Sequence, residues 1–136
     1  MKIAVCLDSR DGMTFGGRRQ SKDIRQREDL LSLTAPGPLW MSTYSAAQFD
    51  SLPDFVVADD DFLNKAGTDD WRFVEREDLS VIAQNVRQLA IYCWNRHYPS
   101  DRKFPRELFA DRWQLTSRRE FPGKSHETIT LEVYDL

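Results

Sequence analysis

A chain of 136 residues, with 40% hydrophobic and 12% aromatic residues, is long enough to bury one core, and we expect a single domain over residues 1–136. No window approaches the ~18 consecutive apolar residues of a membrane span, and Asp8 interrupts the first apolar run, so we expect a cytoplasmic protein without a membrane partner. The net charge of −3 makes a dedicated nucleic-acid binder unlikely by composition, and both cysteines lie in apolar runs, where we expect free, buried thiols.

The first quarter of the chain predicts a strand, a glycine-rich stretch and a helix. Residues 2–8 (KIAVCLD) form a short apolar run that is typical of a buried, central strand. Residues 9–20 contain the turn signals DG and GG, which predict either a hairpin or a flexible loop. Near-helical spacing over 21–34 predicts a helix with Ser21 as its N-cap, which should end before the APGP segment at 35–38.

The middle of the chain alternates predicted strands with predicted helices, as βαβ units do. Strands are predicted at 38–42, 54–59, 71–75 and 90–95. Helices are predicted at 45–52, 60–67 and 79–89. We expect Ser45 and Asp78 to cap the first and third of these helices, and Gly67 to end the second.

The C-terminal part of the chain predicts a β-hairpin. Residues 112–121 and 126–136 alternate apolar and polar side chains and are joined through a Pro-Gly pair. In the last strand, Ile129, Leu131 and Val133 should face the core, while the threonines and the glutamate between them face water. The chain is therefore expected to be an α/β domain with a mostly parallel central sheet flanked by helices and a C-terminal antiparallel hairpin.

Several polar and aromatic residues could form a binding site at the ends of the strands. Arg18 and Arg19, in a basic stretch, could clamp an anion or form part of a solvated face. In open α/β sheets ligands bind at the carboxyl ends of the strands, where Trp40, Glu75 and Asn95 are placed. No metal site is expected, because the two histidines are isolated from any ligand spacing. Neither cysteine has a context that would activate it as a nucleophile.

The order of elements and several local sequences resemble the dihydrofolate reductase family. KIAVCLDSRDGM at 2–13 is similar to that family's first strand and loop, and REDLLSLTAPGPLWM at 27–41 to its acid-bearing helix and second strand. Further along, Asp101, Phe104, Pro105 and Trp113 match the family's Asp-x-x-Phe-Pro turn and its Trp-led penultimate strand. The resemblance implies a reductase fold with a mobile loop at 9–22 that closes over the ligand.

The same resemblance implies roles for particular residues and also marks where this chain departs from the family. The helical acid would be Asp29, or Glu28 one residue earlier, and Asp29 is the candidate proton donor or relay. The family grips its cofactor phosphates with a Gly-Arg-Lys/His-Thr turn after the second strand, whereas this chain has Ser-Thr-Tyr-Ser around Thr43. It also places a Gly-Gly pair after the fourth strand, where this chain continues from Glu75 into Arg76 and another glutamate.

Three functions remain open from the sequence. The first is a module that binds a small-molecule ligand or a protein partner, with a remodelled or lost nucleotide site. The second is a reductase of a pterin-like or other small substrate, for which NADPH would be the cofactor. The third is anion or nucleic-acid binding through Arg18 and Arg19. Arg18, Arg19, Trp40, Thr43, Glu75 and Asn95 are the candidate ligand-binding residues.

Overall fold

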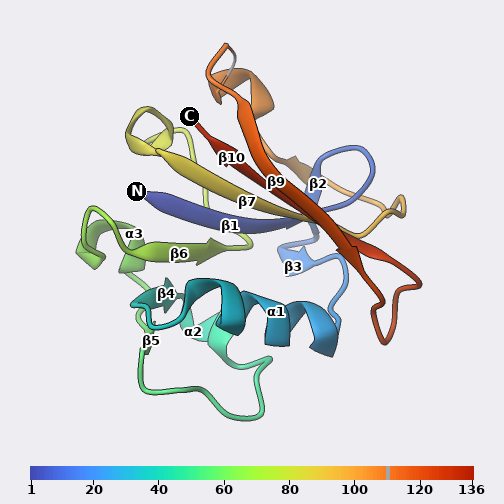
Figure 1. Cartoon of the computed structure of the whole chain (residues 1–136), viewed down its shortest axis with the longest axis horizontal. Coiled ribbons are helices and arrows are strands. Elements are labelled where there is room, and N and C mark those ends of the chain that lie inside the picture. The colour runs from blue at the N-terminus through green and yellow to red at the C-terminus, as the bar shows by residue number, and fades with distance from the viewer. Residues whose placement is uncertain (110) are drawn as a thin grey trace.

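A seven-stranded sheet in the order β5-β4-β6-β1-β7-β10-β9 forms the centre of the computed structural model, which describes residues 1–109 and 111–136 (Figure 1). In chain order its strands are β1 (Lys2–Leu7), β4 (Leu39–Met41), β5 (Val56–Ala58), β6 (Trp71–Val74), β7 (Gln88–Cys93), β9 (Gln114–Phe121) and β10 (Ile129–Asp135). The helices are α1 (Ile24–Thr34), α2 (Thr43–Ala46) and α3 (Phe62–Lys65), and two 3₁₀ turns are η1 (Ala83–Asn85) and η2 (Arg106–Phe109).

The five strands β5, β4, β6, β1 and β7 are parallel, and β10 and β9 add an antiparallel edge. The prediction of a mostly parallel sheet with a C-terminal antiparallel hairpin is therefore confirmed, and β1 is central as expected. Apolar side chains cover both faces of the sheet. One face packs against α1 through Leu30, and the other packs against α3 and the segment 79–86 through Phe62, Leu79 and Ile82.

The last strand is buried more completely than its alternating pattern suggested. Ile129, Leu131 and Val133 face the core as predicted. Thr130, which was expected to face water, is only 3% exposed, and Tyr134 packs against the core on that same face. The reason is that β10 lies between β7 and β9 in a sheet covered on both sides, so neither of its faces is fully open to solvent.

The glycine-rich stretch after β1 is a hairpin. Strands β2 (Gly12–Phe15) and β3 (Arg18–Arg19) pair with each other, and β8 (Arg102–Lys103) pairs with β2 to give a small three-stranded sheet. Gly16 and Gly17 form the turn with φ of 60° and 75°, a region that favours glycine. β3 of this hairpin lies near the carboxyl end of β1 (Figure 1). Arg19 in β3 contacts Glu75, which follows β6.

The helices differ from their predicted caps. Asp23, not Ser21, caps α1, because its carboxylate accepts a hydrogen bond from the backbone N–H of Arg25. Ser42, not Ser45, caps α2, and Ser45 lies buried inside that helix. In both cases the oxygen nearest the first free N–H groups takes the capping role.

The helix predicted at 79–89 does not form. Its apolar spacing is satisfied by consecutive turns and by η1, which is a single 3₁₀ turn. Asp78 accepts from the N–H of Ser80 in a turn, and Val86 is already extended where the chain approaches β7. The spacing of buried residues was thus real, but the turn at Asp78–Ser80 and the extended backbone at Val86 leave only residues 81–85 between them, too few for a longer helix.

Candidate functional site

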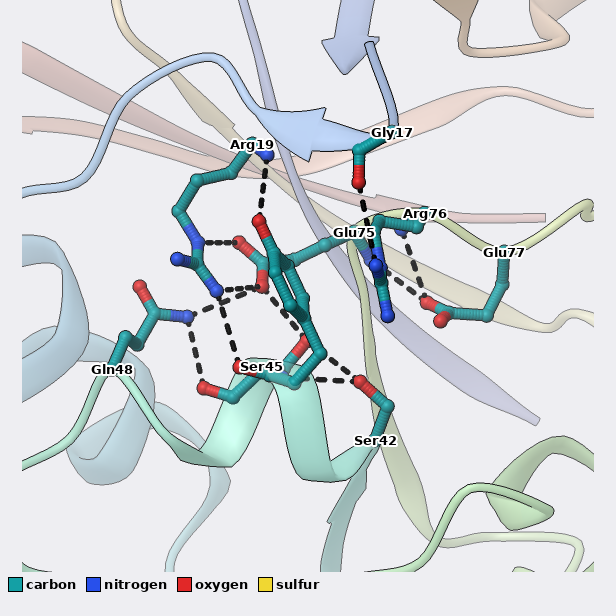
Figure 2. Close-up of polar contacts among 9 residues, drawn as sticks. Gly17, Arg19, Ser42, Ser45, Gln48, Glu75, Arg76 and Glu77 are labelled. Atoms are coloured by element: carbon teal, nitrogen blue, oxygen red, sulfur yellow. Dashed lines mark hydrogen bonds and ion pairs between the residues drawn. The ribbon is translucent and has the colours of Figure 1, made fainter. Parts of the chain in front are cut away.

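The carboxyl end of β6 holds a buried ion pair. Glu75 immediately follows β6 and is 8% exposed. Arg19 reaches it from the β2–β3 hairpin, and its Nε and Nη2 atoms donate to the two carboxylate oxygens at 3.0 and 3.1 Å (Figure 2). This two-point geometry fixes both side chains, since a planar guanidinium and a carboxylate meet in one orientation.

Helix α2 supplies further donors to the same carboxylate. Ser45 Oγ donates to Glu75 at 2.8 Å, and the amide of Gln48 donates at 3.3 Å (Figure 2). Ser42 holds Ser45 in place by accepting from its backbone N–H at 3.1 Å. The charge of Glu75 is therefore compensated by one cation and two neutral donors, as a buried carboxylate requires.

An aromatic ring joins the hairpin to this network. Tyr44 lies between two guanidinium groups, with Arg19 4.3 Å and Arg76 3.7 Å from its ring centroid. The Tyr44 hydroxyl accepts from the backbone N–H of Arg19 at 3.0 Å, and Arg76 donates to the carbonyl of Gly17 at 3.3 Å. Figure 2 shows Arg19, Arg76 and Gly17 converging over α2, so the hairpin is held down on the end of the sheet.

The interior of this network is densely packed and largely excludes water. Burial opposes the charge on Arg19, but its hydrogen bonds with Glu75 outweigh that effect and raise the Arg19 pKa. Burial, reinforced by Glu75, raises the pKa of the neighbouring Cys6 thiol well above its usual value. The space left among Cys6, Trp94 and the ion pair is only ≈ 10 Å³. The crevice at this end of the sheet is therefore filled by the chain's own side chains.

The N-terminus of α2 is also occupied from within the chain. Asp60 accepts from the backbone N–H of Thr43 at 2.9 Å and from its hydroxyl at 2.8 Å. These hydrogen bonds, the backbone one foremost, lower the pKa of Asp60. A carboxylate thus takes the donors that the first turn of a helix would offer to an anion.

Asp29 lies at a different place, on the side of α1 that faces β7 and β9. Both of its oxygens face Arg119, at 2.8 Å, and the Tyr92 hydroxyl donates to it at 2.7 Å. Asp29 lines an open groove of ≈ 510 Å³ between α1 and the β9–β10 hairpin, together with Glu28 and Phe121. The candidate acid is therefore separate from the Arg19–Glu75 pair.

The remaining predicted ligand-binding residues are dispersed. Trp40 donates from its indole N–H to Asp70, which precedes β6, so it points toward the amino end of that strand. Asn95 donates to the carbonyl of Thr128 at 3.0 Å and so ties the end of β7 to the last hairpin. Arg18 is exposed and lies apart from the buried contact that Arg19 makes, so the two arginines do not form a clamp.

Some residues of the site were not singled out from the sequence. Tyr44, Ser45 and Gln48 supply contacts to the ion pair, and Asp60 supplies the anion at α2. The first three lie in one short segment, which gave no distinctive signal, and Asp60 belongs to an acidic run (59–61) that is typical of a solvated turn. The one usable hint was that the charged residue Glu75 directly follows an apolar strand. A charged side chain that is buried at such a position has to be paired with another group.

Across residues 1–109 and 111–136, no helix has the length and apolar character that a bilayer crossing requires. In the same residues, no cluster of three or more potential ligands could hold a metal ion.

No family model matches the chain, and no curated protein matches its sequence. The chain is similar in structure to dihydrofolate reductase from Enterococcus faecalis, which was solved in complex with NADP(H) and RAB-propyl. The two share 10% sequence identity, and the match covers 98% of this chain and 94% of that chain with a TM-score of 0.69. The seven-stranded sheet, its C-terminal hairpin and this likeness together give the chain a dihydrofolate-reductase-like α/β fold.

Proposed function

We propose that the chain is a ligand-binding module in which the crevice at the carboxyl ends of the strands is closed, and that it does not use a nicotinamide cofactor. The observation that carries this proposal is the bidentate Arg19–Glu75 pair, which fills the crevice beside β6. The fold alone does not decide between a reductase and a binding module, since function depends on the residues of the site.

The residues of the crevice fit a phosphate-bearing dinucleotide poorly, which supports the proposal. A planar ring inserted at the carboxyl end of β6 would have to displace the Arg19 side chain and Tyr44, which contact each other there. A phosphate at α2 would meet Asp60, a carboxylate that already occupies the N–H and hydroxyl of Thr43. A phosphate and a carboxylate that compete for the same donors repel each other. The cofactor would therefore have to displace both the Arg19–Glu75 pair and the Asp60–Thr43 contact before it could bind.

The open groove beside α1 offers the better ligand site. Asp29 is anchored by Arg119, and Glu28, which is exposed on the same helix, pairs with Arg25, a further lining residue of the groove. Phe121 forms the opposite wall and presents a partly buried ring. Two carboxylates facing an aromatic ring suit a small planar molecule that donates hydrogen bonds, and ≈ 510 Å³ is within the size range of small-molecule sites.

The test is a two-ligand titration followed by nuclear magnetic resonance. NADPH is expected to leave the backbone resonances of residues 17–19, 42–48 and 75–77 unshifted and to leave the melting temperature unchanged. Planar heterocycles with amino groups, represented by folate and a pteridine, are expected to shift resonances of α1 and of Phe121. Ser32→Trp, which fills the groove from α1, should abolish those shifts, while Ser80→Trp at an exposed site elsewhere should not.

Two results would contradict the proposal. Saturable NADPH binding with shifts around Glu75 would support a reductase with an opened crevice instead. Heterocycle binding that persists in Ser32→Trp would exclude the groove as the ligand site.

A further inference from the structure

A second polar cluster lies near the start of α1, and it makes no hydrogen bond with the Arg19–Glu75 pair, although Ser21 borders the same small cavity. His126 is 3% exposed and is contacted through both ring nitrogens. Its Nδ1 atom lies 3.0 Å from Asp23 Oδ2, and its Nε2 atom lies 3.0 Å from Ser21 Oγ. A second hydroxyl, that of Tyr98, also lies 3.0 Å from Nε2. The Ser21 hydroxyl, the His126 imidazole and the Asp23 carboxylate thus form a continuous chain of hydrogen bonds.

The environment fixes how protons are placed along this line. Asp23 also accepts from the backbone N–H groups of Lys124, Ser125 and His126. Burial opposes its ionisation, but those hydrogen bonds, with the one from the His126 ring, hold the pKa of Asp23 well below its ordinary value. Because the carboxylate can only accept, Nδ1 carries the proton and Nε2 presents its lone pair to the hydroxyls.

The imidazole is also held in position from the side. The Trp94 ring stacks on it with a centroid distance of 4.4 Å and an interplanar angle of 17°. Ser21 is partly exposed, and its hydroxyl also accepts a hydrogen bond from the Tyr98 hydroxyl at 3.5 Å, so a substrate would have to reach Oγ from the solvent side. A buried, oriented base beside an accessible hydroxyl is the arrangement that activates serine nucleophiles.

We propose that Ser21, His126 and Asp23 form an acyl-transfer site in which Ser21 is the nucleophile, His126 the general base and Asp23 the positioning residue. Ser21 Oγ attacks the carbonyl carbon of an ester while its proton passes to His126 Nε2. The tetrahedral adduct collapses as His126 delivers that proton to the departing alkoxide oxygen, which leaves as the alcohol. A water molecule then attacks the acyl group on Ser21 and gives a proton to His126. On collapse of the second adduct the proton returns to Ser21 Oγ and the carboxylic acid is released.

The surroundings of Ser21 decide on which side the acyl group lies. The cavity that borders Ser21 measures ≈ 10 Å³, about the space of one water molecule. An acyl chain cannot enter that cavity and therefore has to lie on the solvent side of Ser21. Small acyl esters, such as acetyl esters, are the simplest substrates that this arrangement would accept.

Covalent labelling tests the proposal without knowledge of the natural substrate. The folded protein is incubated with a short-chain dialkyl fluorophosphate, and the adduct is located by peptide mapping, with hydrolysis of p-nitrophenyl acetate as a second readout. We expect one adduct, on Ser21. Ser21→Ala should lose it, and His126→Gln should slow labelling by about 10²-fold or more, the range that a positioned base contributes. Ser125→Ala, which removes an exposed hydroxyl in the neighbouring loop, should have no effect.

Tyr98→Phe provides a variant that leaves the base in place. Two hydroxyls share the single Nε2 lone pair, so removal of the Tyr98 hydroxyl should raise the labelling rate about twofold. An unlabelled Ser21 in the folded wild-type protein would overturn the proposal, as would labelling that survives in a folded His126→Gln variant. If His126→Gln does not fold, as judged by circular dichroism, Tyr98→Phe decides: a faster rate supports the proposal, and an unchanged or slower rate overturns it.

Discussion

The buried pair between Arg19 and Glu75 should be one of the most strongly coupled interactions in the protein. The two side chains are 19% and 7% exposed and share two hydrogen bonds, so solvent screens them little. Removing Arg19 would leave the Glu75 carboxylate with only Ser45 and Gln48 as donors. We expect Arg19→Met to lower the free energy of unfolding by about 3 kcal/mol, the lower end for one partner of a buried pair, because two donors remain.

A double-mutant cycle measures this coupling directly. Glu75→Met should also cost about 3 kcal/mol, since it leaves a guanidinium without its carboxylate. The double variant removes both charges and should lose no more than either single variant, which gives a coupling free energy of about 3 kcal/mol. Urea unfolding at neutral pH, followed by circular dichroism, provides the free energies. In thermal unfolding each single variant should melt about 10 °C lower.

The exposed pair Arg25–Glu28 on α1 is the matched control. Its side chains are 59% and 57% exposed, and they are three residues apart on a helix. The same cycle on that pair should give a coupling of about 0.5 kcal/mol or less. If the Arg19–Glu75 cycle gave a value as small as the control, the pair would behave as a surface contact, and the closed crevice argued above would be wrong.

Three further outcomes follow from single sites. Gly37→Ala should cost about 2 kcal/mol in urea unfolding, because Gly37 has φ 76° and an added Cβ would lie 2.7 Å from Phe55, whereas Gly16→Ala, with φ 60° and open space, should cost about 1 kcal/mol. The folded-state pKa of Asp23 lies below its unfolded value. Its contribution to the free energy of unfolding is therefore present above the unfolded pKa and is lost as the pH falls below about 4. The free energy of unfolding, measured between neutral and acid pH, should therefore fall less steeply with decreasing pH in Asp23→Asn than in the wild-type protein. Burial raises the pKa of Cys93 to about 12, so alkylation of native Cys93 near pH 8, followed by mass spectrometry, should be about 10³-fold slower than that of the unfolded chain.

The strands could be predicted because each is a short apolar run between turn residues. The strands predicted at 2–8, 38–42 and 71–75 correspond to β1, β4 and β6, which are neighbours in the observed sheet. The failure at 79–89 shows the limit of the same reasoning. Side chains spaced for burial on one face fit both a helix and a series of turns, and here the turn at Asp78 and the extended backbone at Val86 limit the segment to turns.

The two residues of the buried pair could be selected from the sequence one by one, but not as a pair. Arg19 and Glu75 were each candidate ligand-binding residues, yet they lie 56 positions apart and turn out to bind each other. Ser21 and His126 are 105 positions apart, and nothing in their local sequences indicates that they meet. Long-range pairing of polar side chains depends on the topology, which fixes the relative positions of the hairpin, α2 and the last loop.

Asp60 competes with external anions for the N–H and hydroxyl donors of Thr43. Asp60 is tethered 17 residues from Thr43, so it is present at the α2 N-terminus at an effective concentration on the order of millimolar or higher. A free phosphate group would have to displace Asp60 before it could occupy the same donors. Inorganic phosphate and nucleotides in solution would therefore bind there more weakly than at a helix N-terminus without an internal carboxylate.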